Sequence, residues 1–282
     1  MSVTKFMDKF KLELFDSIKI WLMTPEVVSD ALPFEKNLFD LVIFDEASQL
    51  YVEKALPSIY RTKKVIVAGD QKQLKPSSLG KGRILDEIDE EEITDGFLEY
   101  ESLLDAARYK YKHTMLNYHY RSKYEELIAF SNTAFYDNKL LVMANYPYDG
   151  KPIERIKVNG SFIDKKNMEE ANEVVRLVKE ILNNRKNNET FGVITFNVSQ
   201  MNLIEDLIEK EKSIDSDFSI KLTEEEHRTN NGENIGFFVK NIETVQGDER
   251  DIIIFCIGYA KGENGKVNIN FGWLNQDGGE ID

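Results

Sequence analysis

The chain has 282 residues, which is enough for about two domains of ordinary size. Apolar residues make up 41% of the chain and charged residues 30%, so disordered and fibrous classes are excluded. The formal charge of −14 argues against a broad basic surface that would bind polyphosphate by electrostatics alone. It does not exclude nucleic acid, because a narrow groove can bind the backbone through hydroxyls, amides and a few lysines.

The chain has one cysteine, Cys256, inside the apolar run DIIIFCIGYA. No disulfide can form within the chain, so we predict that Cys256 is buried and serves packing. The histidines His113, His119 and His227 have no partners at metal-ligand spacing, which predicts no zinc or iron site. No stretch reaches the roughly 18 apolar residues of a membrane span, and the start of the chain lacks a signal-peptide pattern. We therefore expect a cytoplasmic protein without a membrane partner.

The first half of the chain alternates helical and strand-like signals. Residues 1–33 have helical apolar spacing that is interrupted by a short strand-like stretch, IWLM, at 20–23. The runs at 41–44 (LVIF) and 65–68 (VIVA) suit strands that are covered on both faces, with a helical stretch around 51–62 between them. Both runs lead into carboxylates, and parallel sheets place their chemistry at the carboxyl ends of strands. We therefore predict a parallel α/β sheet with a site at this edge.

A second α/β series begins near residue 112. Before it, the acidic stretch DEIDEEEITD at 86–95 is interpreted as a solvated loop or helix face. After it come the helical KYEELIAFSNTAFY, the long helix NMEEANEVVRLVKEILNNR, the strand FGVITFN, the helix QMNLIEDLIEKE and two strands around a polar turn. We predict two α/β domains, residues 1–110 and 111–282.

Eight short motifs follow one another along almost the whole chain. They are WLMTP at 21–25, FDEASQ at 44–49, GDQKQLKPS at 69–77, LNYHYRS at 116–122, FYDNKL at 135–140, GVITFN at 192–197, VKNIETVQGDERD at 239–251 and FGWLNQDGGE at 271–280. With this ordered set the sequence resembles superfamily 1 helicases, in the branch of the RNA-surveillance and Okazaki-processing helicases, and especially large bacterial members with a DEAS box. The resemblance implies two RecA-like domains of the P-loop NTPase type, with parallel sheets and an ATP site in the cleft between them.

The catalytic residues are expected in the carboxylate and arginine motifs. Hydrolysis of a nucleoside triphosphate needs a magnesium ion on the phosphate oxygens and a group that deprotonates the attacking water. The resemblance implies that Asp45 holds Mg²⁺ through water and that Glu46 is the general base. It also implies that Gln73 senses the γ-phosphate and that Arg121 is an arginine finger from the second domain. The alternatives are two exposed acids that end a strand and a surface arginine in an ion pair.

Further binding residues are implied by the remaining motifs. Gln246 and Gly247 would form a polar turn beside the nucleotide, and Glu249 would bind ribose or organise the cleft. The wider branch has Asp where this chain has Glu243. Hydroxyl and amide side chains at motif ends would contact the backbone of single-stranded DNA or RNA; these are Thr24, Ser77, Thr195, Asn197 and Thr244. Each of these residue types also serves as a helix cap or turn residue, and that alternative stays open.

Two family motifs do not occur in the sequence. The phosphate-binding loop GxxxxGK[ST] is missing, because the Gly80-Lys81 and Gly265-Lys266 pairs lack both the partner glycine and the following Ser or Thr. An arginine-containing motif expected after FGWLNQDGGE is missing too. We therefore expect the middle of a helicase core, cut at both ends, with an incomplete first domain. We expect it to be inactive by itself and to be partnered by the missing upstream and downstream segments.

The expected function is to couple ATP hydrolysis, with Mg²⁺, to movement on DNA or RNA. The alternative is a degenerate RecA-like module that binds nucleic acid or a partner protein without turnover. A truncated product with no independent role is a third interpretation, which the residues do not separate from the second.

Overall fold

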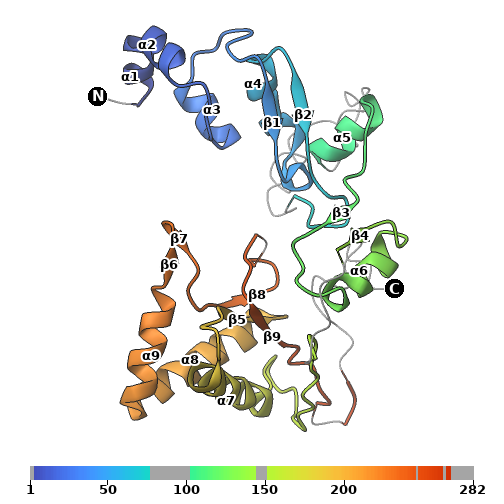
Figure 1. Ribbon diagram of the computed structural model, residues 1–282, viewed down its shortest axis with the longest axis vertical. Coiled ribbons are helices and arrows are strands. Elements are labelled where there is room, and N and C mark those ends of the chain that lie inside the picture. Colours follow the sequence, from blue (N-terminus) through green and yellow to red (C-terminus); the bar gives the residue numbers. More distant parts are fainter. Residues whose placement is uncertain (1–2, 77–101, 144–150, 246, 263–264, 268–282) are drawn as a thin grey trace. The chain divides into compact units, whose positions relative to one another are not determined.

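The structure is a computed structural model (Figure 1). It describes residues 3–76, 102–143, 151–245, 247–262 and 265–267. The acidic stretch at 86–95 lies outside the described residues, as do Ser77 and Gln246. The chain forms two compact units, residues 1–153 and 154–282.

The first unit contains a parallel pair of strands, β1 (Val42–Phe44) and β2 (Val65–Val67). The chain passes between them through α4 (Val52–Tyr60), and α5 (Leu103–Lys110) packs against the same core. The core of this unit is formed by Phe44, Ala47, Ala55, Leu103 and Leu104. The strands predicted at 41–44 and 65–68 are therefore confirmed, together with their parallel pairing.

The segment before β1 is helical. It contains α1 (Val3–Lys9), α2 (Lys11–Ser17) and α3 (Pro25–Ala31). The strand predicted at 20–23 was wrong: these residues pair with no strand of the described part of the chain. Trp21 instead stacks on Phe15 with ring centroids 5.0 Å apart, while Ile20 and Leu22 stay 81% and 93% exposed. A short apolar run gives a strand only where a neighbouring edge supplies hydrogen bonds.

A small β-α-β element ends the first unit. Strand β3 (Tyr118–His119) pairs in parallel with β4 (Leu141–Val142), and α6 (Glu126–Phe135) connects them. The predicted domain border after residue 110 lies inside the first unit, between α5 and β3. The division into domains 1–110 and 111–282 stays a prediction.

The second unit contains a three-stranded parallel sheet in the order β8 (Val239–Asn241), β5 (Phe191–Thr195) and β9 (Ile252–Cys256). Every residue of β5 is buried, as expected for the central strand of a covered parallel sheet. Helices α7 (Met168–Asn184) and α8 (Val198–Ile214) pack together beside this sheet (Figure 1). The predicted α/β class with parallel sheets is thus confirmed in both units.

A further helix and a short hairpin follow α8 in the second unit. Helix α9 (Ser216–Glu226) leads into an antiparallel hairpin of β6 (Thr229–Asn230) and β7 (Glu233–Asn234). Cys256 is 1% exposed within the core, which confirms the predicted burial. In the described part of the chain, no helix combines the length and apolarity required to cross a membrane.

Candidate functional site

The carboxylate pair, Asp45 and Glu46, directly follows β1, and both side chains are exposed. The backbone N–H of Glu46 donates to Asp45 Oδ1 at 3.0 Å. Glu46 has left-handed backbone angles, φ 50° and ψ 39°, at the start of the short 3-10 helix η1 (Ala47–Gln49). The N–H of Ala47 then donates to the carbonyl of Ala68 at 2.9 Å. The turn with the two carboxylates is therefore tied to the end of β2.

Gly69 allows the two strand-end loops to touch. A Cβ atom at this position would lie 3.0 Å from the nitrogen of Ala47 and 3.1 Å from that of Ser48. Backbone atoms cannot move aside as a flexible side chain can, so any larger residue would push the loops apart. The sequence predicted a tight turn here, whereas the structure explains the glycine by this close approach.

Asp70 organises the loop that contains Gln73. Its Oδ1 accepts from the N–H of Lys72 at 2.9 Å, and its carbonyl accepts from the N–H of Gln73 at 3.3 Å. The hydroxyl of Tyr136 donates to Asp70 Oδ2 at 2.5 Å. Burial, and then the hydrogen bond with Asp70, raise the pKa of Tyr136 above the ordinary tyrosine value. The hydroxyl therefore stays a protonated donor at neutral pH.

The exposed carboxylate pair fits a magnesium ion that is shared with a nucleotide. Mg²⁺ keeps several waters and is held by one or two carboxylates plus substrate phosphates. Among the described residues, no group of three or more His, Cys, Asp or Glu forms an all-protein metal cage. Beside the pair, Ser48 is 2% exposed, and its hydroxyl has no hydrogen-bond partner in the described structure. The turn therefore offers exposed oxygen ligands, while the sequence shows no GxxxxGK[ST] loop for the phosphates.

Arg121 follows β3 and is exposed. His119 Nε2 accepts from the N–H of Ser122 at 3.1 Å and lies 2.7 Å from Ser122 Oγ, which closes a turn around Arg121. This turn belongs to the first compact unit, as do the carboxylate pair and Gln73. The role of Arg121 on phosphate stays a prediction.

Four of the five residues predicted to bind nucleic acid lie among the described residues, and each has an internal partner there; they are Thr24, Thr195, Asn197 and Thr244. Thr24 Oγ1 caps α3 by accepting from the N–H of Val27 at 3.4 Å. Thr195 is fully buried, and its hydroxyl donates to the carbonyl of Asn197 at 3.0 Å. Thr244 Oγ1 lies 2.8 Å from Asn241 Oδ1 in the turn after β8. These are the cap and turn roles of the structural alternative, and the nucleic-acid contacts stay predictions.

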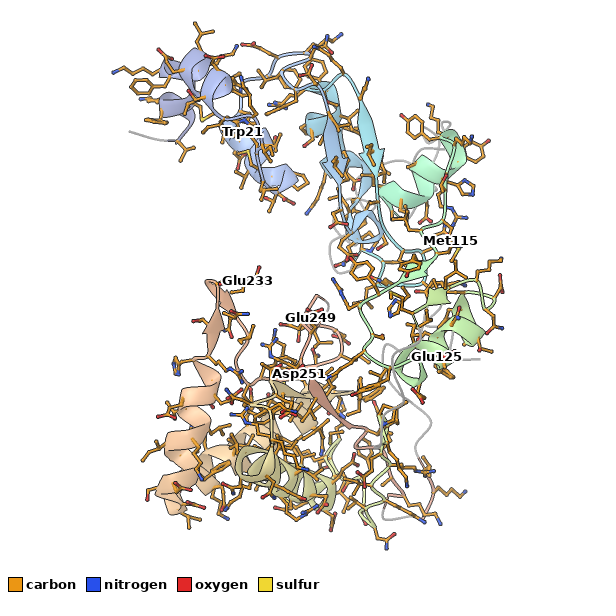
Figure 2. The ribbon with its side chains drawn as sticks, viewed as in Figure 1. Trp21, Met115, Glu125, Glu233, Glu249 and Asp251 are labelled. Carbon is orange, nitrogen blue, oxygen red and sulfur yellow. The ribbon has the colours of Figure 1, made fainter. Side chains whose placement is uncertain are left out.

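The loop between β8 and β9 contains the predicted ribose residue. Glu249 is exposed on this loop, and Asp251 lies where the loop meets β9 (Figure 2). Gly247 has φ 86° with open space around its missing Cβ, so a side chain there would strain the backbone without meeting a neighbour. The roles predicted for Gly247 and Glu249 stay predictions.

A buried polar network at the carboxyl ends of β5 and β9 was missed in the sequence. Asn197 Oδ1 caps α8 by accepting from the N–H of Gln200 at 2.8 Å. The Gln200 side chain accepts from the N–H of Asn167 at 2.7 Å and donates to its carbonyl at 3.0 Å. Glu170 accepts from the N–H of Gly258 at 3.0 Å. The only sequence signal was the Asn at each helix start, which predicts caps but not the partners.

The chain is similar in sequence to known proteins. Residues 148–277 match a protein-family model described as an AAA domain. Over 268 residues the chain is 38% identical to an uncharacterized ATP-dependent helicase of Mycoplasma genitalium and 39% identical to its homologue in Mycoplasma pneumoniae. The chain is similar to ATP-dependent helicases along most of its length. Each alignment covers 93% of this chain but 23% of the relative, so the chain spans less than a quarter of those proteins.

A third relative is less similar and matches a shorter part of the chain. An uncharacterized ATP-dependent helicase of Methanocaldococcus jannaschii is 31% identical over 144 residues, which is 51% of this chain and 18% of that protein. The AAA-domain match contains β5, β8 and β9, and the observed α/β architecture with parallel sheets is consistent with a RecA-like P-loop NTPase. The carboxylate pair, Gln73 and Arg121 lie outside the matched range.

Proposed function

We propose that the chain is part of the ATPase core of a nucleic-acid helicase or translocase of superfamily 1, with ATP and Mg²⁺ bound at the carboxyl ends of β1 and β2. The observation that carries the proposal is the contact between two strand-end loops. One contains the carboxylate pair, the other contains Gln73, and Gly69 lets their backbones meet. Parallel sheets bind ligands at this edge, and the similar Mycoplasma proteins are named as ATP-dependent helicases.

Each side chain has a distinct task in this proposal. Asp45 would hold the magnesium ion, which would supply positive charge to the phosphate oxygens of bound ATP. Glu46 accepts the proton of the attacking water. Gln73 has an amide that both donates and accepts, which suits a group that senses the γ-phosphate. Arg121 is a bidentate donor for transferring phosphate.

The second candidate is a RecA-like module that binds nucleic acid or a partner protein without turnover. The observation in its favour is the lack of GxxxxGK[ST] in the sequence, because that loop supplies the amides and the lysine that hold the β- and γ-phosphates. Under the first candidate, another segment or another chain has to supply this loop.

Phosphate release from MgATP separates the two candidates. The purified chain is assayed without nucleic acid, with single-stranded DNA and with single-stranded RNA. Glu46→Gln is the test variant, and Glu53→Gln, an exposed carboxylate on α4, is the matched control. Turnover that nucleic acid stimulates and that only Glu46→Gln abolishes supports the ATPase. Equal turnover in Glu46→Gln refutes the role of Glu46. Binding of nucleic acid without turnover favours the second candidate for the chain alone.

A further inference from the structure

Tyr136 joins two parts of the first unit that are 66 residues apart in sequence. Its hydroxyl donates to Asp70, and Asp70 in turn holds the loop of residues 69–73 through the N–H groups of Lys72 and Gln73. Both carboxylate oxygens of Asp70 are therefore used, one within its own loop and one across to Tyr136. A hydrogen bond to an ionised acceptor is stronger than one between neutral groups. This bond therefore holds the loop of residues 69–73 against the segment that follows α6.

The backbone on both sides of Tyr136 is held in place. The N–H of Tyr136 donates to the carbonyl of Asn132 at 3.3 Å, at the end of α6. The Asn132 side chain then pairs with the backbone of Leu140 in both directions, accepting at 3.0 Å and donating at 3.2 Å. Tyr136 is also half-buried. Hydrogen bonds through Asn132 thus connect Tyr136 with the residues that enter β4.

Strand β4 pairs with β3, the strand that precedes the Arg121 turn. The N–H of Leu141 donates to the carbonyl of Asn117 at 2.6 Å, and β4 pairs with β3 through Leu141 and Val142. Arg121 lies two residues after β3, in the turn that His119 closes. Hydrogen bonds and short stretches of backbone therefore connect the loop of Gln73 with the turn of Arg121. The hydrogen bond between Tyr136 and Asp70 is the contact in this series that joins residues far apart in sequence.

We infer that the Tyr136–Asp70 hydrogen bond is a latch that sets the position of the Arg121 turn relative to the loop of Gln73. The inference rests on the proposed function, in which both residues act on one triphosphate. Tyr136 is then a positioning residue: it touches no phosphate and acts through Asp70 on one side and β4 on the other. Misplacement of a catalytic group by about 1 Å is enough to slow a reaction by about 100-fold, so loss of the latch lowers kcat while KM for ATP stays unchanged.

The test compares Tyr136→Phe, which removes only the hydroxyl, with Tyr111→Phe, an exposed tyrosine of the same unit. Amide hydrogen exchange is measured on the whole chain. The exchange rates of Lys72, Gln73, Ser122 and Leu141 are expected to rise about 10- to 100-fold in Tyr136→Phe, as for loss of one hydrogen bond to a charged group. The amides of β5 in the second unit, and all amides in Tyr111→Phe, are expected to keep the wild-type rates.

Each outcome decides the inference. Unchanged exchange at all four amides overturns the latch, and a rise limited to Lys72 and Gln73 overturns its connection to Arg121. Adding Tyr136→Phe to Asp70→Ala is expected to cause no further rise, because both changes break the same bond. In any preparation that turns over ATP, Tyr136→Phe should lower kcat about 10- to 100-fold at constant KM. Absence of turnover bears on the proposed function alone, and the exchange rates then decide the latch.

Discussion

Replacement of Glu225 by Gln should destabilise the second unit more than any other charge-neutralising change in α9. The Glu225 side chain is 4% exposed and accepts from Arg185 Nη2 at 2.6 Å and from Arg228 Nη1 at 3.1 Å. The side chains of the two arginines are themselves only 13% and 25% exposed. Removing one member of a buried ion network costs about 3–5 kcal/mol, because the remaining charges stay buried without compensation. We expect a loss of about 3 kcal/mol in the free energy of unfolding, the low end, because both arginines keep some contact with water.

The loss should depend on pH with a definite sign. Burial by itself would raise the pKa of Glu225, but the hydrogen bonds and charges of Arg185 and Arg228 outweigh it and hold the pKa below the ordinary value of 4.5. A carboxyl whose pKa is lower in the folded state stabilises the fold fully above its unfolded pKa, and this contribution is lost as the pH falls through the folded pKa. The difference between wild type and Glu225→Gln should therefore be constant near pH 7 and shrink below about pH 4.

Thermal and urea unfolding, followed by circular dichroism, measure this difference. Glu224→Gln is the matched control, because Glu224 is the exposed neighbour on the same helix. A loss of about 3 kcal/mol corresponds to a fall in Tm of roughly 10 °C for a unit of this size. If Glu225→Gln unfolds within about 0.5 kcal/mol of Glu224→Gln at pH 7, the network is as weak as a surface ion pair and the reasoning is refuted.

Three further perturbations test the packing of the two units. Arg61→Met should cost about 3 kcal/mol or more in urea unfolding, because the 2% exposed guanidinium donates to the carbonyls of Leu32, Pro33 and Pro57, which would lose their partners. Gly69→Ala should cost about 1–3 kcal/mol, since its Cβ would meet backbone nitrogen at 3.0 Å; equal stability would contradict the close approach. Cys256 should react with a thiol reagent at pH 8 only after unfolding, because burial raises its pKa to about 12; fast labelling of the folded chain would disprove its burial.

The strands were predictable because their signal is local. LVIF and VIVA are continuous apolar runs, and a covered parallel strand needs such a run whatever its neighbours are. The carboxylates at the ends of these strands could be predicted too, because they directly follow the apolar runs in the sequence. IWLM at 20–23 has an equally good local pattern, but the described structure contains no edge that pairs with it. Pairing depends on residues far away in sequence, so pattern alone could not separate the two cases.

The contacts that organise the site could not be predicted. Nothing in GDQKQ specifies that Asp70 meets Tyr136, since an aspartate after a strand has many donors within reach of a folded chain. The reason for Gly69 was also hidden, because glycine serves turns and close approaches alike and only the position of Ala47 distinguishes them. Sequence patterns give element types and residue chemistry, whereas these contacts follow from how the elements pack.

The backbone of Glu46 supports a chemical role for its side chain without any appeal to relatives. Among the described non-glycine residues with positive φ, all but Glu46 and Lys165 are Asn or Asp, which tolerate this conformation. Lys165 lies in a tight turn closed by two hydrogen bonds between Ile163 and Lys166, so hairpin geometry explains it. Glu46 lies in no hairpin, and a left-handed glutamate costs about 1 kcal/mol or more relative to glycine. Strained residues cluster at functional sites, and this carboxylate lies exposed at the edge where parallel sheets bind their ligands.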